Sequence, residues 1–313
     1  AASDVYKRQE VTILTQPVSQ PTAVALGLFD GVHLGHQAVL RAAAACRQDG
    51  LLPCAFTFQS ASMPKKQNRE LEYLYTESQK LEHLAAAGIA AVYQPDFAAL
   101  RELDGAAFCR TVLRDMLHAE QVFCGGDFRF GKAAGWGFSD LAAFGSACGF
   151  TAVEVQPVRI QGEIVSSSRI RQALKDGDPE SAAAMLGTPY EVEGIVVHGR
   201  ALGRTISFPT INLQFQEGQL VPRHGVYAAD VQTPDGAWHW GVANVGVKPT
   251  IAVGLHPSVE VHLLDYSGDL YGAVCRVQLH HFLRSEQQFE TITQLQAAIA
   301  QDCIHAREWV AKK

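Results

Sequence analysis

The sequence has little that would place the protein in a membrane, in an oxidising compartment or on nucleic acid. It contains no apolar run of membrane-spanning length, and no charged start followed by an apolar core like that of a signal peptide. Its seven cysteines form no C-x-x-C pair, and no long basic run is present. We therefore expect a cytoplasmic protein with reduced thiols that binds neither nucleic acid nor membranes and is a monomer or weak homo-oligomer.

The composition is that of an ordinary globular protein. The chain has 313 residues, of which 47% are hydrophobic and 19% charged, and its formal net charge is −6. This length favours two domains over one. An acidic protein can still bind nucleotides, because loops and helix ends supply the local positive field.

Residues 24–36 read as an apolar strand, a glycine-rich turn and the beginning of a helix with two histidines three residues apart. Free backbone N–H groups at a helix N-terminus, next to two imidazoles, suit a nucleotide polyphosphate. The alternative is that the histidines only cap the helix or lie on the surface. The strand–turn–helix context favours the phosphate site.

Strand and helix signals alternate through the first half of the chain. Apolar runs predict strands at 22–28, 52–58, 91–94, 122–124 and 151–155. Helical spacing predicts helices at 36–47, 77–87, 104–118 and 141–148. This alternation indicates an α/β domain with a doubly wound, Rossmann-like parallel sheet, in which ligands bind at the carboxyl ends of the strands.

From Tyr190 onward short strands recur without intervening helices. They are expected at 193–197, 226–231, 238–245, 259–264 and 274–279, separated by turn residues. This pattern predicts a small antiparallel β-barrel, against which a helix at 293–311 packs. We predict two domains, residues 10–186 and residues 187–313.

Residues 199–212 form a second informative stretch. Gly199 and Gly203 permit a backbone that wraps an anion, and Arg204 adds positive charge. Thr210 and Asn212 are two residues apart, so on an extended chain their oxygens point the same way and suit Mg²⁺. Taken alone, Pro-Thr-x-Asn is also typical of a turn.

Two further stretches carry charged residues with open alternatives. In the strand at 258–264, Glu260 is either an outward, solvated carboxylate or a general base near a bound hydroxyl. In Ser166-Ser-Ser-Arg-Ile-Arg171, the serines suit a helix start. Arg169 and Arg171 cannot share one helix face, so one of them is free to reach an anion site; a capped surface helix with solvated arginines is the alternative.

Together these motifs resemble the bifunctional bacterial riboflavin kinase/FAD synthetase family. Gly27-x-Phe-Asp-Gly-Val-His-x-Gly-His36 is similar to the family's adenylyltransferase signature, and Gly126-Asp-Phe-Arg-Phe-Gly131 to its flavin/nucleotide loop. Residues 166–171 resemble the second phosphate motif of nucleotidyltransferases. In the C-terminal half, the stretches that resemble the kinase module in order are 199–212, 225–227, 244–250 and 260–266.

The resemblance implies two sequential reactions on riboflavin, FMN and ATP. The C-terminal module would phosphorylate riboflavin to FMN with MgATP, and the N-terminal module would transfer AMP from ATP to FMN, giving FAD and pyrophosphate. Glu260 would take the ribityl proton, Thr210 and Asn212 would hold Mg²⁺, and His33, His36 and Arg171 would stabilise phosphate charge. The implied ATP and phosphate contacts are Gly27, Phe29, Asp30, Gly31, Gly35, Ser167, Ser168, Gly199, Gly203 and Arg204, and the implied flavin contacts are Phe58, Asp127 and Phe128.

The sequence departs from the family's pattern in the adenylyltransferase half. Residues 59–62 read Gln-Ser-Ala-Ser where the family carries a Pro-His-Pro turn, and Lys132 stands where many members have an arginine. An alternative is therefore a riboflavin kinase or flavin-binding regulator with an impaired adenylyltransferase half. A cytidylyl- or pantetheine-type adenylyltransferase is another, but such enzymes lack the C-terminal motifs.

Overall fold

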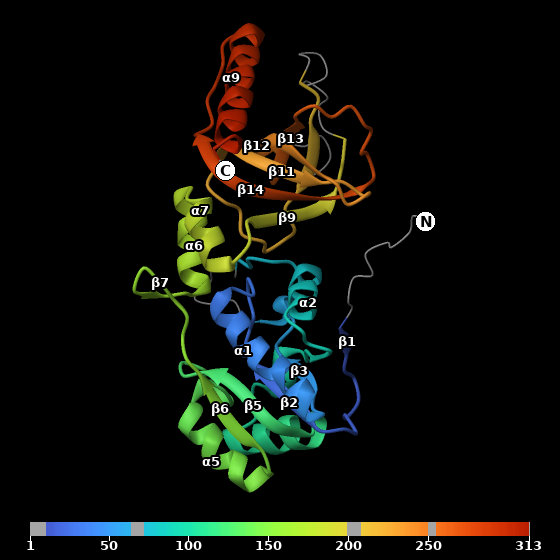
Figure 1. Ribbon diagram of the computed structural model, residues 1–313, viewed down its shortest axis with the longest axis vertical. Helices are drawn as coiled ribbons and strands as arrows, with labels where there is room; N and C mark the ends of the chain where they lie inside the picture. The colour runs from blue at the N-terminus through green and yellow to red at the C-terminus, as the bar shows by residue number, and fades with distance from the viewer. Residues whose placement is uncertain (1–10, 64–71, 199–207, 250–254, 313) are drawn as a thin grey trace. The chain divides into compact units, whose positions relative to one another are not determined.

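The computed structural model describes residues 11–63, 72–198, 208–249 and 255–312 (Figure 1). The chain divides into two compact units, Ala1–Ser166 and Ser167–Lys313. Residues 167–186, which the sequence analysis assigned to the first domain, are therefore grouped with the second unit. The functional boundary at residue 186 stays a prediction.

The first unit contains a six-stranded parallel sheet, as predicted. Its strands are β1 (Thr12–Ile13), β2 (Thr22–Leu26), β3 (Leu52–Phe56), β4 (Ala91–Tyr93), β5 (Ala119–Gly125) and β6 (Thr151–Val155). They lie in the order β1-β4-β3-β2-β5-β6, and each neighbouring pair is parallel. The strand order changes direction between β2 and β5, which makes this the switch point where a ligand crevice is expected.

Helices cover both faces of this sheet because successive residues of each strand point to opposite sides. Ala23 and Ala25 of β2 belong to one buried cluster, whereas Val24 and Leu26 belong to another. The first face packs against α1 (Leu34–Ala45) and α2 (Glu77–Ala86), and the second against α4 (Gly105–Phe108), the π-helix Cys109–Met116 and α5 (Phe138–Cys148). The first unit also contains α3 (Phe97–Leu100) and a hairpin of β7 (Arg159–Ile160) and β8 (Glu163–Ile164).

Local sequence signals set several helix ends. Thr76 caps α2, and Gln79 completes a capping box, as the predicted helix start required. Gly149 ends α5 at φ 86°. The predicted helix at 104–118 is an α-helical turn that continues as a π-helix, with Asp104 as its N-cap.

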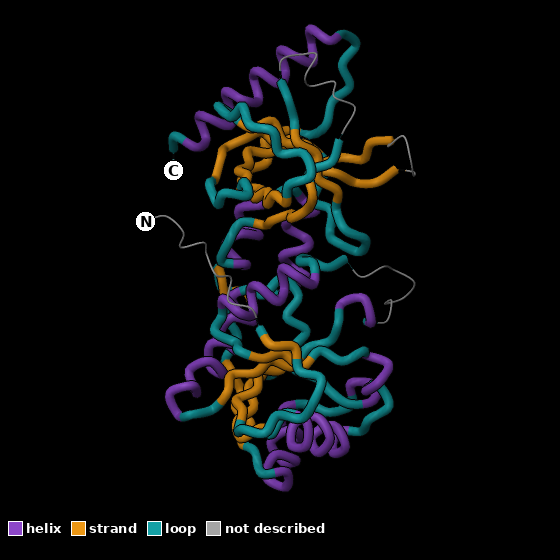
Figure 2. Tube along the Cα trace, turned by 90° about the vertical axis from the view of Figure 1, so that its right-hand side faces the viewer, coloured by secondary structure: helices purple, strands orange, loops and turns teal. Residues whose placement is uncertain are grey.

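The second unit contains a six-stranded antiparallel sheet that curls into a barrel (Figure 2). Its strands are β9 (Tyr190–Ile195), β10 (Ile211–Gln214), β11 (Gly225–Gln232), β12 (Trp238–Pro249), β13 (Leu255–Leu263) and β14 (Val274–Arg284). The order is β10-β13-β12-β11-β14-β9, and an antiparallel bridge between Val197 and Asn212 links the two edges. The predicted barrel is thereby confirmed.

Among the described residues of the second unit, three helices accompany the barrel. They are α6 (Ser167–Asp176), α7 (Pro179–Leu186) and the long C-terminal α9 (Ile292–Val310). Ala306 and Trp309 of α9 pack against Val226 and Val242, so the helix packs against the barrel as predicted. Ile304, which the helical spacing also placed on the packing face, is exposed instead. The backbone N–H of Arg223 donates to the carbonyl of Leu174 in α6 at 2.9 Å.

All seven cysteines are free. Burial raises the pKa of the Cys54, Cys109 and Cys124 thiols to about 12, which keeps them protonated and unreactive. Within the described ranges, none of the helices combines the length and the apolar character needed to cross a membrane.

Candidate active sites

The first candidate site lies at the carboxyl ends of neighbouring parallel strands. Gly27 directly follows β2, Gly126 directly follows β5, and Phe58 comes two residues after β3. Since β3, β2 and β5 are adjacent, the three segments leave the sheet at the same edge. The structure therefore brings together the phosphate and flavin motifs that the sequence predicted at the switch point.

The loop after β2 has a strained backbone. Phe29 has φ 52° and Val32 has φ 38°, in the left-handed region that side chains disfavour. Phe29 is completely buried, and a Cβ added at Gly27 would lie only 2.9 Å from its ring. The Asp30 carboxylate accepts a hydrogen bond from the backbone N–H of Leu74 at 2.8 Å. Phe29 and Asp30 thus hold the loop in shape.

The two histidines stand together at the beginning of α1. His33 is the N-cap, and its Nδ1 accepts a hydrogen bond from the backbone N–H of His36 at 3.2 Å. The two rings stack with their centroids 3.6 Å apart and an angle of 14° between them. A Cβ at Gly35 would lie 3.1 Å from the His33 ring, so the small residue between them permits this packing. The capping role considered from sequence is therefore real, and it arranges both rings at the helix N-terminus.

The burial of His36 affects both its pKa and the hydrogen bonding of its ring. Burial, and then the neighbouring His33, lower the pKa of His36 well below its usual value. Its buried Nδ1 has no hydrogen-bond partner among the residues that the structure describes. Buried polar atoms are nearly always satisfied, so this nitrogen fits a ligand group.

The predicted flavin residues lie around the same sheet edge. Phe58 is half-buried and meets the rings of Phe56 and Phe97 edge to face, each with 5.2 Å between centroids. Asp127 is exposed, while Phe128 is half-buried and stacks with Phe130 at 5.9 Å. An acidic group and aromatic surfaces are thus available next to the phosphate loop.

The second candidate site is a polar row on the outer face of the barrel. Glu260 of β13 pairs in register with Asn212 of β10 on one side and with Asn244 of β12 on the other. Directly opposed residues point to the same face of a sheet. Their neighbours Val259 and Val261 are completely buried and fill the interior, so the half-buried Glu260 faces outward between two amides.

Asn244 is a candidate site residue that the sequence analysis did not single out. Its amide Nδ2 donates to Oε1 of Glu286 at 3.4 Å. The stretch 244–250 resembles the kinase module, but only the strand register places Asn244 beside Glu260, because Asn244 lies on a different strand from both Asn212 and Glu260. The residues of this row become one site only when three strands are aligned.

The donor set next to this row suits a hard cation. Thr210 comes immediately before β10, and Asn212 within β10 is 9% exposed. The Pro209 carbonyl, which precedes them, lies 2.9 Å from Nδ1 of His262 and accepts its hydrogen bond. The Thr210 hydroxyl and the Asn212 amide oxygen are oxygen ligands of the kind that Mg²⁺ prefers, so the residues present fit this ion.

Some predicted residues are not joined to either site by the structure. Gly199, Gly203 and Arg204 lie outside the described residues. Ser167, Ser168 and Arg171 lie in the first two turns of α6, which belongs to the second unit. Their part in adenylyl transfer stays a prediction.

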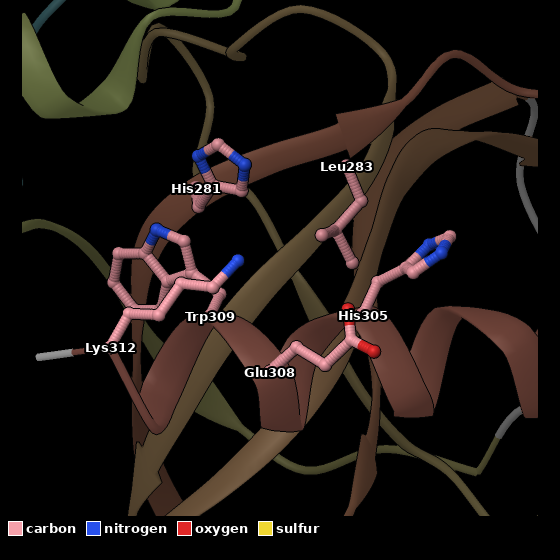
Figure 3. Close-up of a pocket in the computed structure, with 6 residues that line it drawn as sticks. All are labelled: His281, Leu283, His305, Glu308, Trp309 and Lys312. Carbon is pink, nitrogen blue, oxygen red and sulfur yellow. The ribbon is translucent and has the colours of Figure 1, made fainter.

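A separate hollow lies between β14 and α9 (Figure 3). The His281 ring stacks on Trp309 with 5.6 Å between centroids and an angle of 11°. None of the residues predicted from the sequence lines it. The lining residues are His281, Leu283, His305, Glu308, Trp309 and Lys312.

Comparisons with known proteins cover both units. Residues 15–169 match the FAD synthetase family and residues 186–310 match the riboflavin kinase family. The bifunctional riboflavin kinase/FMN adenylyltransferase of Listeria monocytogenes is 34% identical over 92% of this chain and 92% of its own length. Its counterpart in Escherichia coli is 35% identical over 95% of each chain.

A solved structure from Streptococcus pneumoniae, titled as a macrolide-efflux protein, shares the fold. Its TM-score is 0.84 at 30% identity, and the match covers 94% of this chain and 96% of that one. The two matched domains stand in the order that the motifs predicted. This chain belongs to the bifunctional riboflavin kinase/FMN adenylyltransferase family.

Proposed function

We propose that this chain performs two consecutive steps of flavin cofactor synthesis. The barrel phosphorylates riboflavin to FMN with ATP, and the parallel-sheet domain transfers AMP from a second ATP to FMN, releasing pyrophosphate and giving FAD. One observation carries the proposal. A phosphate-type loop at the switch point and a carboxylate flanked by two amides occur in separate regions, and these match the FAD synthetase and riboflavin kinase families respectively.

In the kinase step, Glu260 accepts the proton of the ribityl 5′-hydroxyl as that oxygen attacks the γ-phosphorus of ATP, whose bond to the bridging oxygen breaks and releases ADP. Asn212 and Asn244 flank Glu260 on the two neighbouring strands. Thr210 and Asn212 would hold Mg²⁺, which neutralises phosphate charge when bound. Phosphoryl transfer depends mainly on such positioning and charge neutralisation, with a base to accept the alcohol proton.

In the adenylyl-transfer step, a phosphate oxygen of FMN attacks the α-phosphorus of ATP and pyrophosphate leaves. The attacking oxygen is already anionic, so this step needs no general base. His33, His36 and the backbone N–H groups at the beginning of α1 stabilise the charge that develops on the phosphates. We assign Arg171 of α6 to the same task, on the resemblance of its motif.

One assay tests this function. Purified protein is incubated with riboflavin, ATP and Mg²⁺, and the flavins are separated by chromatography, with omission of ATP as the control. We expect FMN to form first and FAD to follow. Formation of FMN alone would support a kinase with an impaired adenylyltransferase half. Absence of both products would contradict the proposed function.

A further inference from the structure

The turn that follows β3 has an unusual composition for a segment beside a candidate flavin residue. Residues Ser60–Ser62 form a single 3₁₀ turn two residues after Phe58. The turn contains neither proline nor histidine, although the family to which the chain belongs carries a Pro-His-Pro turn at this position. Without proline the unfolded segment has more conformational freedom to lose, so its native shape has to come from contacts.

The helix α2 supplies most of those contacts. Oε2 of Glu77 accepts a hydrogen bond from the Ser60 N–H at 3.0 Å. The Lys80 ammonium donates to the Phe58 carbonyl at 2.9 Å and to the Ser60 hydroxyl at 3.3 Å. The Tyr73 hydroxyl donates to the Ser60 carbonyl. Every polar group of Ser60 is therefore held, and so is the carbonyl of Phe58.

Lys80 is buried, which makes its role more specific. Its side chain is only 3% exposed and lies 2.8 Å from Oε1 of Glu77, whose side chain is 35% exposed. Burying an ammonium group is unfavourable unless it is paired and hydrogen-bonded. Here the ammonium group is paired with Glu77 and donates to the Phe58 carbonyl and to the Ser60 hydroxyl of the adjoining turn.

The other end of the turn is tied to the aromatic neighbour of Phe58. The Ser62 hydroxyl accepts from the Phe97 N–H at 3.0 Å and donates to the Gln59 carbonyl at 2.8 Å. The Phe97 ring is the one that meets Phe58 edge to face. The same turn thus controls both the backbone of Phe58 and the placement of the ring beside it.

We propose that Lys80 is a positioning residue of the FMN adenylyltransferase site, which acts through Phe58 and the Ser60–Ser62 turn to set the affinity for FMN. This inference rests on the proposed function, in which Phe58 contacts the flavin. The Lys80 ammonium donates to Phe58 and Ser60, and neither of these residues is assigned to the reacting phosphates. Its loss therefore raises the KM for FMN more than it lowers kcat.

The test measures FAD formation from supplied FMN and ATP with the full chain. Lys80→Met keeps a similar volume and removes the ammonium group; we expect the KM for FMN to rise about tenfold and kcat to stay within about twofold. Riboflavin kinase activity of the same sample should be unchanged. Arg114→Met is the matched control, because it removes a cation from an exposed pair with Asp115 in the same unit.

Ser60→Ala tests the same contact more gently, since it removes only the hydroxyl that Lys80 reaches. We expect about a threefold rise in the KM for FMN. If Lys80→Met fails to fold, as circular dichroism and a thermal melt would show, the Ser60→Ala result decides. An unchanged KM for FMN in the folded variants would overturn the inference. A wild-type chain that forms no FAD would instead overturn the proposed function.

Discussion

In the first unit the candidate phosphate site is continuous in sequence, whereas in the barrel the candidate site is assembled from separate strands. Gly27, His33 and His36 follow one another along a single loop and helix start. Asn212, Asn244 and Glu260 come from β10, β12 and β13, and only strand register places them side by side. The first site is formed by one continuous segment of the chain, and the second forms only when the strands of the barrel are paired.

This difference affects how each site should respond to mutation. The loop site depends on backbone shape and buried rings, so a substitution there disturbs both structure and binding. The barrel row consists of outward side chains on a sheet whose interior is filled separately by residues such as Val259 and Val261. A substitution in the row should therefore change chemistry with little effect on stability. The predictions below test this contrast from the largest expected effect to the smallest.

Glu260→Gln should lower the kcat of riboflavin kinase about a thousandfold, because a general base contributes roughly that factor. The amide has the same shape but cannot accept the ribityl proton. FAD formation from supplied FMN and the melting temperature should both stay at wild-type values. Steady-state kinetics of the two half-reactions and a thermal melt measure all three. A large loss of stability would contradict the view of the row as a surface feature.

His33→Ala should reduce FAD formation about a hundredfold, since removing one donor to a developing phosphate charge has an effect of this order. It also removes the N-cap of α1, which costs about 1 kcal/mol of stability. FMN formation from riboflavin should continue at the wild-type rate. Equal loss of both activities would refute the division into two sites.

Asn244→Ala should lower kinase kcat about tenfold, because it removes the polar side chain that lies in register beside the Glu260 base and donates to Glu286. Gln214→Ala is the matched control, because this exposed amide lies on β10 and pairs with Ser258 rather than with Glu260. Its kinase activity should be unchanged. Similar losses in the two variants would show that the register with Glu260 has no special role.

The smallest effect concerns pH. The pKa of His36 is lowered in the folded protein. Below about pH 6.5 this histidine is therefore protonated in the unfolded chain but still neutral in the folded chain. The contribution of the neutral histidine to the free energy of unfolding is therefore fully present above that pH. It falls as the pH is lowered, by about 1 kcal/mol at pH 5.5. Thermal melts of the wild type and of His36→Gln between pH 5.5 and 8 measure this. Parallel curves for the two proteins would contradict it.

The contrast between the sites also explains what the sequence could and could not predict. The cap at Thr76, the end of a helix at Gly149 and the strand before Gly27 are local signals, and the structure confirms them. The short strand β10 was not predicted, because its first two residues, Ile211 and Asn212, belong to a Pro-Thr-Ile-Asn stretch that also suits a turn. The stretch 244–250 was matched to the kinase module, but Asn244 was given no role, since no local pattern encodes its register with Glu260.

The backbone conformation of the loop after β2 is another feature that the sequence could not predict. The sequence predicts a glycine-rich turn here, yet Phe29 and Val32 adopt positive φ as well as Gly31. Phe29 is completely buried in the cluster that packs against α1 and α2, and this is a tertiary contact. Periodicity and propensity carry no information about it.

The hydrogen bond that caps α1 also decides where a neutral His33 carries its proton. Nδ1 accepts from the backbone N–H of His36 and so has no hydrogen, which places the proton of the neutral imidazole on Nε2. The helix start thereby selects one tautomer, and His33 can donate a hydrogen bond without first becoming charged. A serine or aspartate at this position would restore the cap but not the second donor. The same ring therefore serves both the fold and the chemistry.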